Sequence, residues 1–380
     1  MWVVVLAAAA GQSCAERVRI GFSSCVNQNR ASAALEAVGR EASLEAFVFL
    51  GDNGYHDTPS CGIPWAIEAC SAWEWLGEVG RLWVRLWRRA WRGAAAEDSL
   101  RRADDYRDLT SRHVGPLRRM LPSTAFLATW DDHDLGANDA DSTYPFLSDA
   151  LSAFVRFWRR PDMELEYSGG GASAASTVYK AYRLKGDIQV LLLDVRSYRT
   201  PLTRAFGSAW KLVELAKLAR LRAADAICEP REYEPSEGTM LGVGQWQWLE
   251  ERLAEPARVR VVVSSIQVLR PDDGAESWAN MPREKERLLA ALEGASGQVI
   301  ILSGDVHYGE VSVLGSLTEV TASGLTETWP CVHYNPLAVD GSLVRTHNYG
   351  IADIDFANNA TTLSLHNARG NMTFRLQLEL

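Results

Sequence analysis

Short apolar runs alternate with segments of helical periodicity along most of the chain, and this alternation restricts the folds open to it. The apolar runs lack a polar face, as strands do when both faces of their sheet are covered. The pattern therefore predicts a layered α/β domain. The strand-like runs are residues 18–22, 46–50, 125–129, 188–193, 258–263 and 299–302. The helix-like segments are residues 31–43, 65–92, 103–120, 148–158, 245–253 and 282–292.

The C-terminal part, residues 349–380, has a different pattern. Apolar and polar residues alternate over 350–356, 361–367 and 371–380, around turn-like asparagines and glycine. Alternation of this kind is typical of strands with one face toward solvent. We expect an antiparallel meander that extends a sheet rather than forming a separate domain.

The N-terminus is a candidate signal peptide. Residues 2–10 are apolar, and small residues at Ser13 and Ala15 fit cleavage after Ala15. The run is too short to span a bilayer. A signal peptide over 1–15 predicts a secreted or extracytoplasmic protein, but no basic residue precedes the apolar run. The alternative is an N-terminal β-strand.

The cysteines agree with export. If Cys14 leaves with the signal peptide and Cys25 binds a metal, four cysteines remain, enough for two disulfides. Cys61 and Cys70 are close enough in sequence to pair with each other. The connectivity stays open from sequence alone.

Charge and composition bear on partners. A net charge of −9 argues against a nucleic-acid partner held by phosphate contacts, and no protein partner is implied. Residues 81–92 carry tryptophans at helical spacing with arginines between them. This segment is either a helix that contacts a membrane surface or covers a substrate, or an amphipathic helix whose tryptophans pack on the protein body.

Polar side chains gather directly after the predicted strands, where open α/β sheets place their ligands. Four loops share this position: residues 24–25, residues 51–55, residues 130–138 and residues 303–307. A single such loop is weak evidence, because Asp and His in loops are commonly solvated or cap helices. Four loops in the same context indicate one binding site.

The donor types indicate metal ions of more than one kind. The thiolate of Cys25, the phenolate of Tyr55 and the imidazole of His307 favour a transition metal such as iron.

The oxygen donors of the same loops favour a different ion. Asp131 and Asn138 suit a hard ion such as calcium. Asp52 and Asp305 are candidates to bridge two ions, since a carboxylate has two oxygens to offer.

A single catalytic zinc lowers the pKa of its bound water to about 7, and adjacent cations that share a bridging water would likewise supply hydroxide at neutral pH. The same ions stabilise the charge that develops on a phosphate ester under attack. His133 is a candidate to orient a substrate oxygen or protonate the leaving group. Arg196 and Arg199 either contact the phosphate bidentately or brace the loops through Asp194.

Taken together, these motifs resemble the PhoD-like alkaline phosphatase family, within the calcineurin-like metallophosphoesterases. The resemblance starts near residue 18, runs to the C-terminus and keeps the family's motif order. The motifs are SC at 24–25, GDxxY at 51–55, WDDHD at 130–134, LDVRSYR at 193–199, LGxxQxxWL at 241–249, SGDVH at 303–307 and EVTASGLT at 319–326.

The resemblance implies a fold and a set of ligands. The fold is a four-layer αββα sandwich of two mixed sheets flanked by helices, and the cofactors are Fe³⁺ and Ca²⁺. By resemblance the iron ligands are Cys25, Asp52, Tyr55 and His307, and the calcium ligands are Asp131, Asn138 and Asp305. Which of Asp131 and Asp132 binds metal directly stays open.

The resemblance also implies a phosphoric-ester hydrolase, with a metal-bridging hydroxide as nucleophile. Family members cleave phosphomonoesters and phosphodiesters, so the alternative is a phosphodiesterase or phospholipase that acts on lipid head groups. A second alternative is a non-catalytic metal-binding surface protein. We expect one catalytic domain over residues 16–380, with a Trp- and Arg-rich helical insertion around 64–120.

Overall fold

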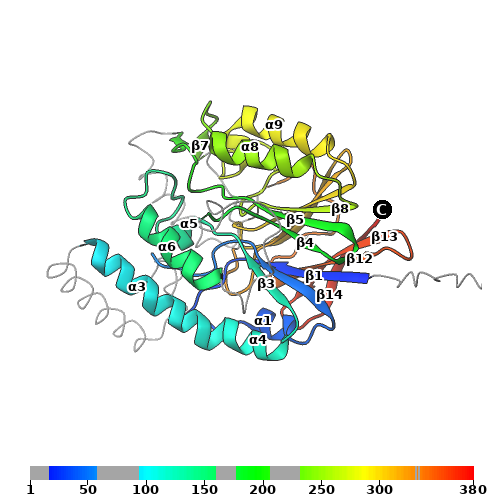
Figure 1. Cartoon of the computed structure of the whole chain (residues 1–380), viewed down its shortest axis with the longest axis horizontal. Helices are drawn as coiled ribbons and strands as arrows, with labels where there is room; N and C mark the ends of the chain where they lie inside the picture. The colour runs from blue at the N-terminus through cyan, green and yellow to red at the C-terminus, as the bar shows by residue number, and fades with distance from the viewer. Residues whose placement is uncertain (1–16, 58–93, 160–176, 206–231, 330–331, 333) are drawn as a thin grey trace, which may run out of the picture.

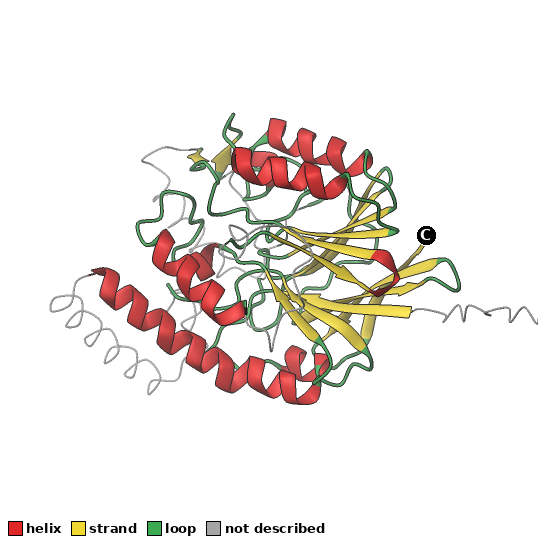
Figure 2. Ribbon diagram, viewed as in Figure 1, coloured by secondary structure: helices red, strands yellow, loops and turns green. Residues whose placement is uncertain are grey.

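The computed structural model describes residues 17–57, 94–159, 177–205, 232–329, 332 and 334–380. Two six-stranded mixed sheets pack face to face, and helices cover their outer faces (Figures 1 and 2). This is the four-layer αββα sandwich that the resemblance implied, so the predicted fold class is confirmed.

The first sheet joins the N-terminal strands to the C-terminal ones. Its strand order is β14-β13-β12-β1-β2-β3, with β1, β2 and β3 parallel and the remaining pairs antiparallel. The strands are β1 (Arg17–Ser23), β2 (Leu44–Phe49), β3 (Ala125–Ala128), β12 (Asn348–Asp355), β13 (Ala360–Asn367) and β14 (Met372–Glu379). The last three strands form an antiparallel meander at one edge.

The second sheet comes from the middle of the chain. Its order is β10-β11-β9-β8-β5-β4, with the four central strands parallel and an antiparallel strand at each edge. The strands are β4 (Lys180–Leu184), β5 (Ile188–Leu192), β8 (Val259–Val263), β9 (Gln298–Ser303), β10 (Gly309–Leu314) and β11 (Leu317–Ala322). A separate pair joins β6 (Thr203–Arg204) and β7 (Tyr233–Glu234).

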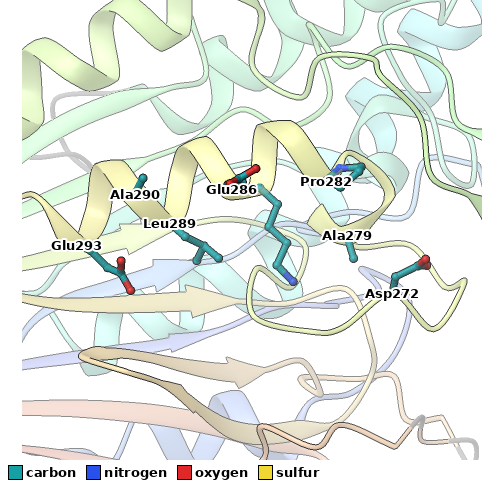
Figure 3. Close-up of a pocket in the computed structure, with 8 residues that line it drawn as sticks. Asp272, Ala279, Pro282, Glu286, Leu289, Ala290 and Glu293 are labelled. Carbon is teal, nitrogen blue, oxygen red and sulfur yellow. The ribbon is translucent and has the colours of Figure 1, made fainter.

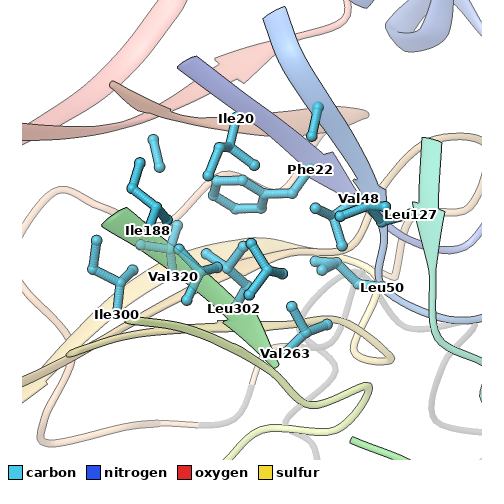
Figure 4. Close-up of a cluster of buried hydrophobic side chains, with 14 of the residues drawn as sticks. Ile20, Phe22, Val48, Leu50, Leu127, Ile188, Val263, Ile300, Leu302 and Val320 are labelled. Atoms are coloured by element: carbon cyan, nitrogen blue, oxygen red, sulfur yellow. The ribbon is translucent and has the colours of Figure 1, made fainter. Parts of the chain in front are cut away.

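The main core lies between the two sheets (Figure 4). Ile20 and Phe22 of β1 face it, together with Val48 from β2. Ile300 and Leu302 of β9 face it from the other sheet. Neighbouring residues of the same strands point to the outer layers, because side chains alternate along a strand.

Helices bury both outer faces. Phe49 of β2 packs against Trp158 below the first sheet, and Trp246 and Leu288 cover the second. The first outer layer contains α1 (Ala33–Val38), α3 (Ala94–Leu109), α4 (Gly115–Met120) and α6 (Leu147–Trp158), and the second contains α8 (Gly242–Leu253) and α9 (Pro282–Glu293). The described residues also include the short elements α5 (Asp132–Leu135), the π-helix η2 (Thr110–Val114), and the 3₁₀ helices η4 (Lys185–Asp187) and η6 (Trp278–Asn280).

Several predicted features lie outside the described residues: the signal peptide over 1–15, the tryptophan- and arginine-rich segment 81–92, and the four cysteines expected in disulfides. Cys25 is the one cysteine within the described part, where it is buried and free. No helix in the described ranges has both the length and the apolar character needed to cross a membrane.

Candidate metal centre

The strand ends of the two sheets meet at one edge of the sandwich. Ser24, directly after β1, forms a parallel bridge with Ser323, directly after β11, and its N–H donates to Ala322 at 3.1 Å. This contact aligns the loop that carries Cys25 with the loops of the second sheet. Residues from both sheets can therefore face a common space.

Cys25, Asp52, Tyr55 and His307 come together there, from three loops that are separated in the chain. The Tyr55 hydroxyl donates to Asp52 Oδ2 at 3.2 Å and lies 3.1 Å from His307 Nε2. The Cys25 Sγ lies 3.5 Å from the same Asp52 oxygen. Donor atoms of Cys25, Asp52 and His307 all lie within 4.8 Å of one another. This spacing suits one metal ion, and the donor types suit iron.

The electrostatics of this group call for a cation. Burial, reinforced by Asp52, raises the pKa of the Cys25 thiol well above its usual range. Burial and the nearby Asp52 and Cys25 likewise raise the pKa of the Tyr55 phenol. Burial, with His133 nearby, lowers the pKa of His307 to about 3. The imidazole is therefore a neutral donor, and a bound cation would supply the charge that thiolate and phenolate forms need.

Two further donor groups adjoin the first. Asp52, Asp132 and His133 form one group, and Asp131, Asp132 and Asp305 form the other, each with donor atoms within 4.8 Å. Asp52 and Asp132 each belong to two groups, so the three groups form one continuous array. Two buried oxygens in it, Asp52 Oδ1 and Asp131 Oδ2, have no hydrogen-bond partner. Buried carboxylates without partners are costly, and hard cations remove that cost, so the residues fit metal ions.

Asp131 and Asp132 differ in how their oxygens are engaged. Asp131 Oδ1 accepts the hydroxyl of Ser265 at 2.7 Å and the Nε of Arg196, which leaves Oδ2 unpartnered. Both oxygens of Asp132 accept backbone N–H groups, at 2.9 and 2.7 Å. Asp131 thus has the more available oxygen, while Asp132 is held in place between the donor groups.

Four candidate ligands have left-handed backbone conformations. The φ angles are 63° at Cys25, 51° at Asp52, 71° at Asp305 and 61° at His307. Non-glycine residues adopt this region rarely, and such strain gathers at functional sites. The backbone is therefore bent at the positions that turn these side chains toward the array.

Asn138, predicted as a calcium ligand, is exposed in the turn after α5. Gly136 ends that short helix in a left-handed conformation. The backbone N–H of Asp139, not the Asn138 side chain, then reaches the array by donating to Asp132 Oδ2 at 2.7 Å. The turn therefore brings a backbone donor to the array and leaves Asn138 at the surface.

Arg196 and Arg199 were predicted either to contact the phosphate or to brace the loops. Both guanidinium groups are fully buried and pair with Glu276, so the geometry favours bracing over substrate contact. Glu276 binds the guanidinium groups, while Asp194 accepts the backbone N–H groups of Arg196 and Ser197 at 3.1 and 2.9 Å. Asp194 also accepts the indole N–H of Trp130 at 2.8 Å and so joins its loop to the WDDHD loop.

His133 is oriented by a carboxylate that sequence reasoning missed. Its Nδ1 lies 2.7 Å from Asp57 Oδ1, and its ring stacks on Tyr55 with centroids 4.3 Å apart. Burial lowers the pKa of His133, but Asp57, Asp132 and Asp52 outweigh burial and raise it well above the usual value. Asp57 therefore holds the imidazole in one orientation beside the array, and without bound cations the neighbouring carboxylates favour its protonated form.

Asp134 and Asn53 join two loops of the array by hydrogen bonds, and neither residue was predicted to have a role in the site. Asp134 accepts the backbone N–H of Asn53 at 3.1 Å and that of Asp131 at 3.0 Å. The Asn53 amide also donates to the Thr129 carbonyl at 2.7 Å. Both residues lie inside motifs already singled out, GDxxY and WDDHD. Their position beside the ligands was the signal available.

Helix α3 packs against the WDDHD loop from outside. Arg102, paired with Asp98 at 2.7 Å, donates to the carbonyl oxygens of Asp134 and Leu135. Those carbonyls belong to the last turn of α5, where a cation is favourable. The contact fixes the end of the loop that carries three of the candidate ligands.

A surface hollow of about 560 Å³ lies along α9 (Figure 3). Its lining includes Leu289 and Ala290 with the acidic Asp272 and Glu286, and no candidate ligand is among its lining residues. The Lys285 ammonium donates to the Arg270 carbonyl. The hollow is therefore separate from the metal centre.

A two-sheet sandwich with a continuous array of metal donors at its strand ends defines a metallophosphatase-like protein. The chain belongs to the PhoD-like phosphatase family, which it matches over residues 20–329. No curated protein is similar enough in sequence to count as a relative.

Solved structures agree on the fold. The structure of PhoD is similar with a TM-score of 0.58 at 15% identity, covering 92% of this chain and 65% of that chain. The structure of GAP50, described as the anchor in the inner membrane complex of Plasmodium, has a TM-score of 0.51 at 10% identity and covers 96% and 89%. At these identities the likeness extends to the fold alone.

Proposed function

We propose that this protein is a metal-dependent phosphoric-ester hydrolase. The observation that carries the proposal is the continuous donor array, in which Asp52 and Asp132 each belong to two donor groups. Ions held by neighbouring groups would be close enough to act on one phosphate. Membership of the PhoD-like phosphatase family supports the same activity.

The proposed cofactors are Fe³⁺ at Cys25, Asp52, Tyr55 and His307, and Ca²⁺ at the carboxylate groups. When bound, such ions would lower the pKa of a shared water to give hydroxide and would neutralise phosphate oxygens. The protein's own residues supply position and a proton. Asp57 fixes the ring of His133, so that the imidazolium can donate to the leaving oxygen of the ester.

Metal analysis and a substrate panel test this proposal. We expect the purified protein to contain iron and a hard divalent ion, and to hydrolyse p-nitrophenyl phosphate. Prolonged chelation should abolish the activity, and return of iron and calcium should restore it. Hydrolysis that survives complete metal removal would refute the proposal.

The same panel decides between ester classes. Bis-p-nitrophenyl phosphate and phosphatidylcholine report diesterase and phospholipase activity. Rates on these far above the rate on p-nitrophenyl phosphate would make the protein a diesterase instead. Contact of residues 81–92 with a membrane belongs to that alternative.

A non-catalytic role is the other alternative. One structural neighbour is described as an anchor, so the fold by itself does not imply catalysis. Intact donors at Cys25, Asp52 and His307 favour an enzyme. A reconstituted protein that holds its metals and hydrolyses none of the panel would support the alternative.

Export to an extracytoplasmic compartment remains part of the proposal, and it rests on the N-terminal sequence. A fusion of residues 1–20 to a reporter enzyme tests it. Processing after Ala15 and recovery of the reporter outside the cytoplasm are expected. An unprocessed reporter retained in the cytoplasm would refute it.

A further inference from the structure

Glu276 lies in the interior between two arginines. Its two oxygens accept both terminal nitrogens of Arg196, at 2.7 and 2.8 Å, and one of them also accepts from Arg199. The arginine side chains are 0% exposed and that of Glu276 is 7% exposed. Arg199 is held further by the Asp139 carbonyl at 2.7 Å. Two cations thus share one carboxylate away from water.

The bidentate pair determines what Arg196 offers to the metal centre. With both terminal nitrogens turned toward Glu276, Arg196 presents its Nε to Asp131 Oδ1. Ser265 occupies the same oxygen, and Asp131 Oδ2 stays unpartnered. The nearest Arg196 nitrogen to Asp132 Oδ1 is 3.8 Å away. Arg196 therefore lies beside both carboxylates, but it makes a close hydrogen bond with one oxygen only, Oδ1 of Asp131.

A guanidinium without Glu276 would behave differently. Its fork matches a carboxylate bidentately, and such charge-assisted pairs are the strongest that arginine forms. Asp131 and Asp132 are the adjacent carboxylates. A freed Arg196 would compete with metal ions for the same oxygens, because a buried cation keeps a counter-charge wherever one is in reach.

We propose that Glu276 is a positioning residue of the metal centre: it holds the terminal nitrogens of Arg196 and thereby reserves Asp131 and Asp132 for a hard divalent ion. The proposal deepens the proposed function and rests on it, since it assumes a divalent ion at these carboxylates. The pair of Glu276 and Arg196 thus braces the loops and also keeps the terminal nitrogens of Arg196 away from the metal ligands. Arg196 is a competitor that Glu276 restrains.

If Glu276 restrains Arg196 and Arg196 competes with calcium, substitutions at the two positions should have opposite effects on calcium affinity. Titration calorimetry on the full-length protein, after calcium removal, measures this affinity. Glu276→Gln keeps the side-chain shape but removes the charge that restrains Arg196. Calcium should bind roughly 10–100-fold more weakly, the effect usual for a group that orients a metal ligand. Arg196→Met removes the competitor, so calcium should bind at least as tightly as in the wild type.

Equal weakening by both substitutions would mean that the pair is only a scaffold, and wild-type affinity in Glu276→Gln would mean that Glu276 does not position the site. Either result would overturn the proposal. The double variant Arg196→Met/Glu276→Gln provides a second measurement, also where Glu276→Gln alone fails to fold. It should fold and bind calcium within about tenfold of the wild type, and weak binding by a folded double variant would also overturn the proposal.

Iron content, which depends on Cys25 and His307, serves as the internal control in every variant. A wild-type protein that binds no calcium would count against the proposed function itself. That outcome differs from equal calcium affinities of Glu276→Gln and Arg196→Met, which would count against the role of Glu276 alone.

Discussion

The Tyr55 hydroxyl lies 3.1 Å from Nε2 of His307, although 252 positions separate the two residues in the chain. Tyr55 follows a strand of the first sheet and His307 a strand of the second. The contact therefore spans the two halves of the sandwich. A metal held by both residues would join the sheets at the edge where their strands end.

The thiol at the centre of this group gives the first prediction. Cys25→Ser should remove iron and any visible colour due to thiolate ligation, because a hydroxyl is a poor ligand for ferric iron in place of a thiolate. Elemental analysis and visible absorption measure both. Ser24→Ala, which removes the hydroxyl 3.2 Å from Cys25 Sγ, is the matched control and should keep its iron. Unchanged iron in Cys25→Ser would end the assignment of Cys25 as a ligand.

His133 gives a kinetic prediction. His133→Ala should leave metal content unchanged, because Asp52 and Asp132 each belong to a second donor group that lacks His133. It should lower kcat by roughly 10²–10⁴-fold, the usual contribution of an acid–base group. Asp57→Asn should lower kcat less, because an amide oxygen still accepts from the ring Nδ1 that lies 2.7 Å from Asp57. Steady-state rates on p-nitrophenyl phosphate measure both. A wild-type rate in His133→Ala would make this histidine structural.

Asp134 gives a prediction about stability. Asp134→Ala leaves the N–H groups of Asn53 and Asp131 buried without their acceptor. We expect the free energy of unfolding to fall by about 1–3 kcal/mol or more, measured by urea denaturation. Asp149→Ala, at an exposed position of α6, should change it by less than about 0.5 kcal/mol. Equal effects of the two substitutions would contradict the locking role of Asp134.

The metal-free protein should be sensitive to pH. Burial raises the pKa of Asp131 from 3.8 to about 6, and the pKa values of Asp134 and Asp139 from 3.8 to about 7. Carboxyls with raised pKa values bind more protons in the folded state than in the unfolded state. The free energy of unfolding should therefore decrease as the pH rises from about 4 to about 7.

Urea denaturation in the presence of a chelator, at pH 5 and at pH 8, measures this decrease. Metal-loaded protein should show a weaker dependence, since bound cations stabilise the charged carboxylates. Higher stability at pH 8 than at pH 5 without metal would contradict the prediction.

Much of the fold could be predicted from sequence because most central strands contain a run of consecutive apolar residues. The predicted runs 46–50 and 299–302 agree with the bounds of β2 and β9 to within two residues at each end. The hairpin of β10 and β11 was missed because Glu310 and Glu319 interrupt its apolar pattern. Glu319 is buried and accepts the N–H groups of Val268 and Leu269 at 2.8 and 2.7 Å. Such a tertiary contact leaves no local signal, although the alternation around Gly315 was available.

In the candidate site, too, some residues could be predicted from local sequence and others could not. Donors directly after strands, such as Cys25 and Asp52, follow from the position of the strand, which local sequence encodes. Glu276 and Asp57 act through contacts with residues 80 and 76 positions away, which spacing does not reveal. Asn138 was predicted from its position after the third predicted strand, but its orientation depends on the turn that Gly136 makes possible.

The left-handed backbone at Cys25, Asp52, Asp305 and His307 has a consequence for laboratory evolution. Glycine would relax the chain at each position, yet it would delete a donor each time. A screen that selects for thermal stability alone should enrich glycine at these four positions and yield a more stable protein that no longer binds its ions. Screens on this scaffold therefore need to reward metal retention together with thermal tolerance.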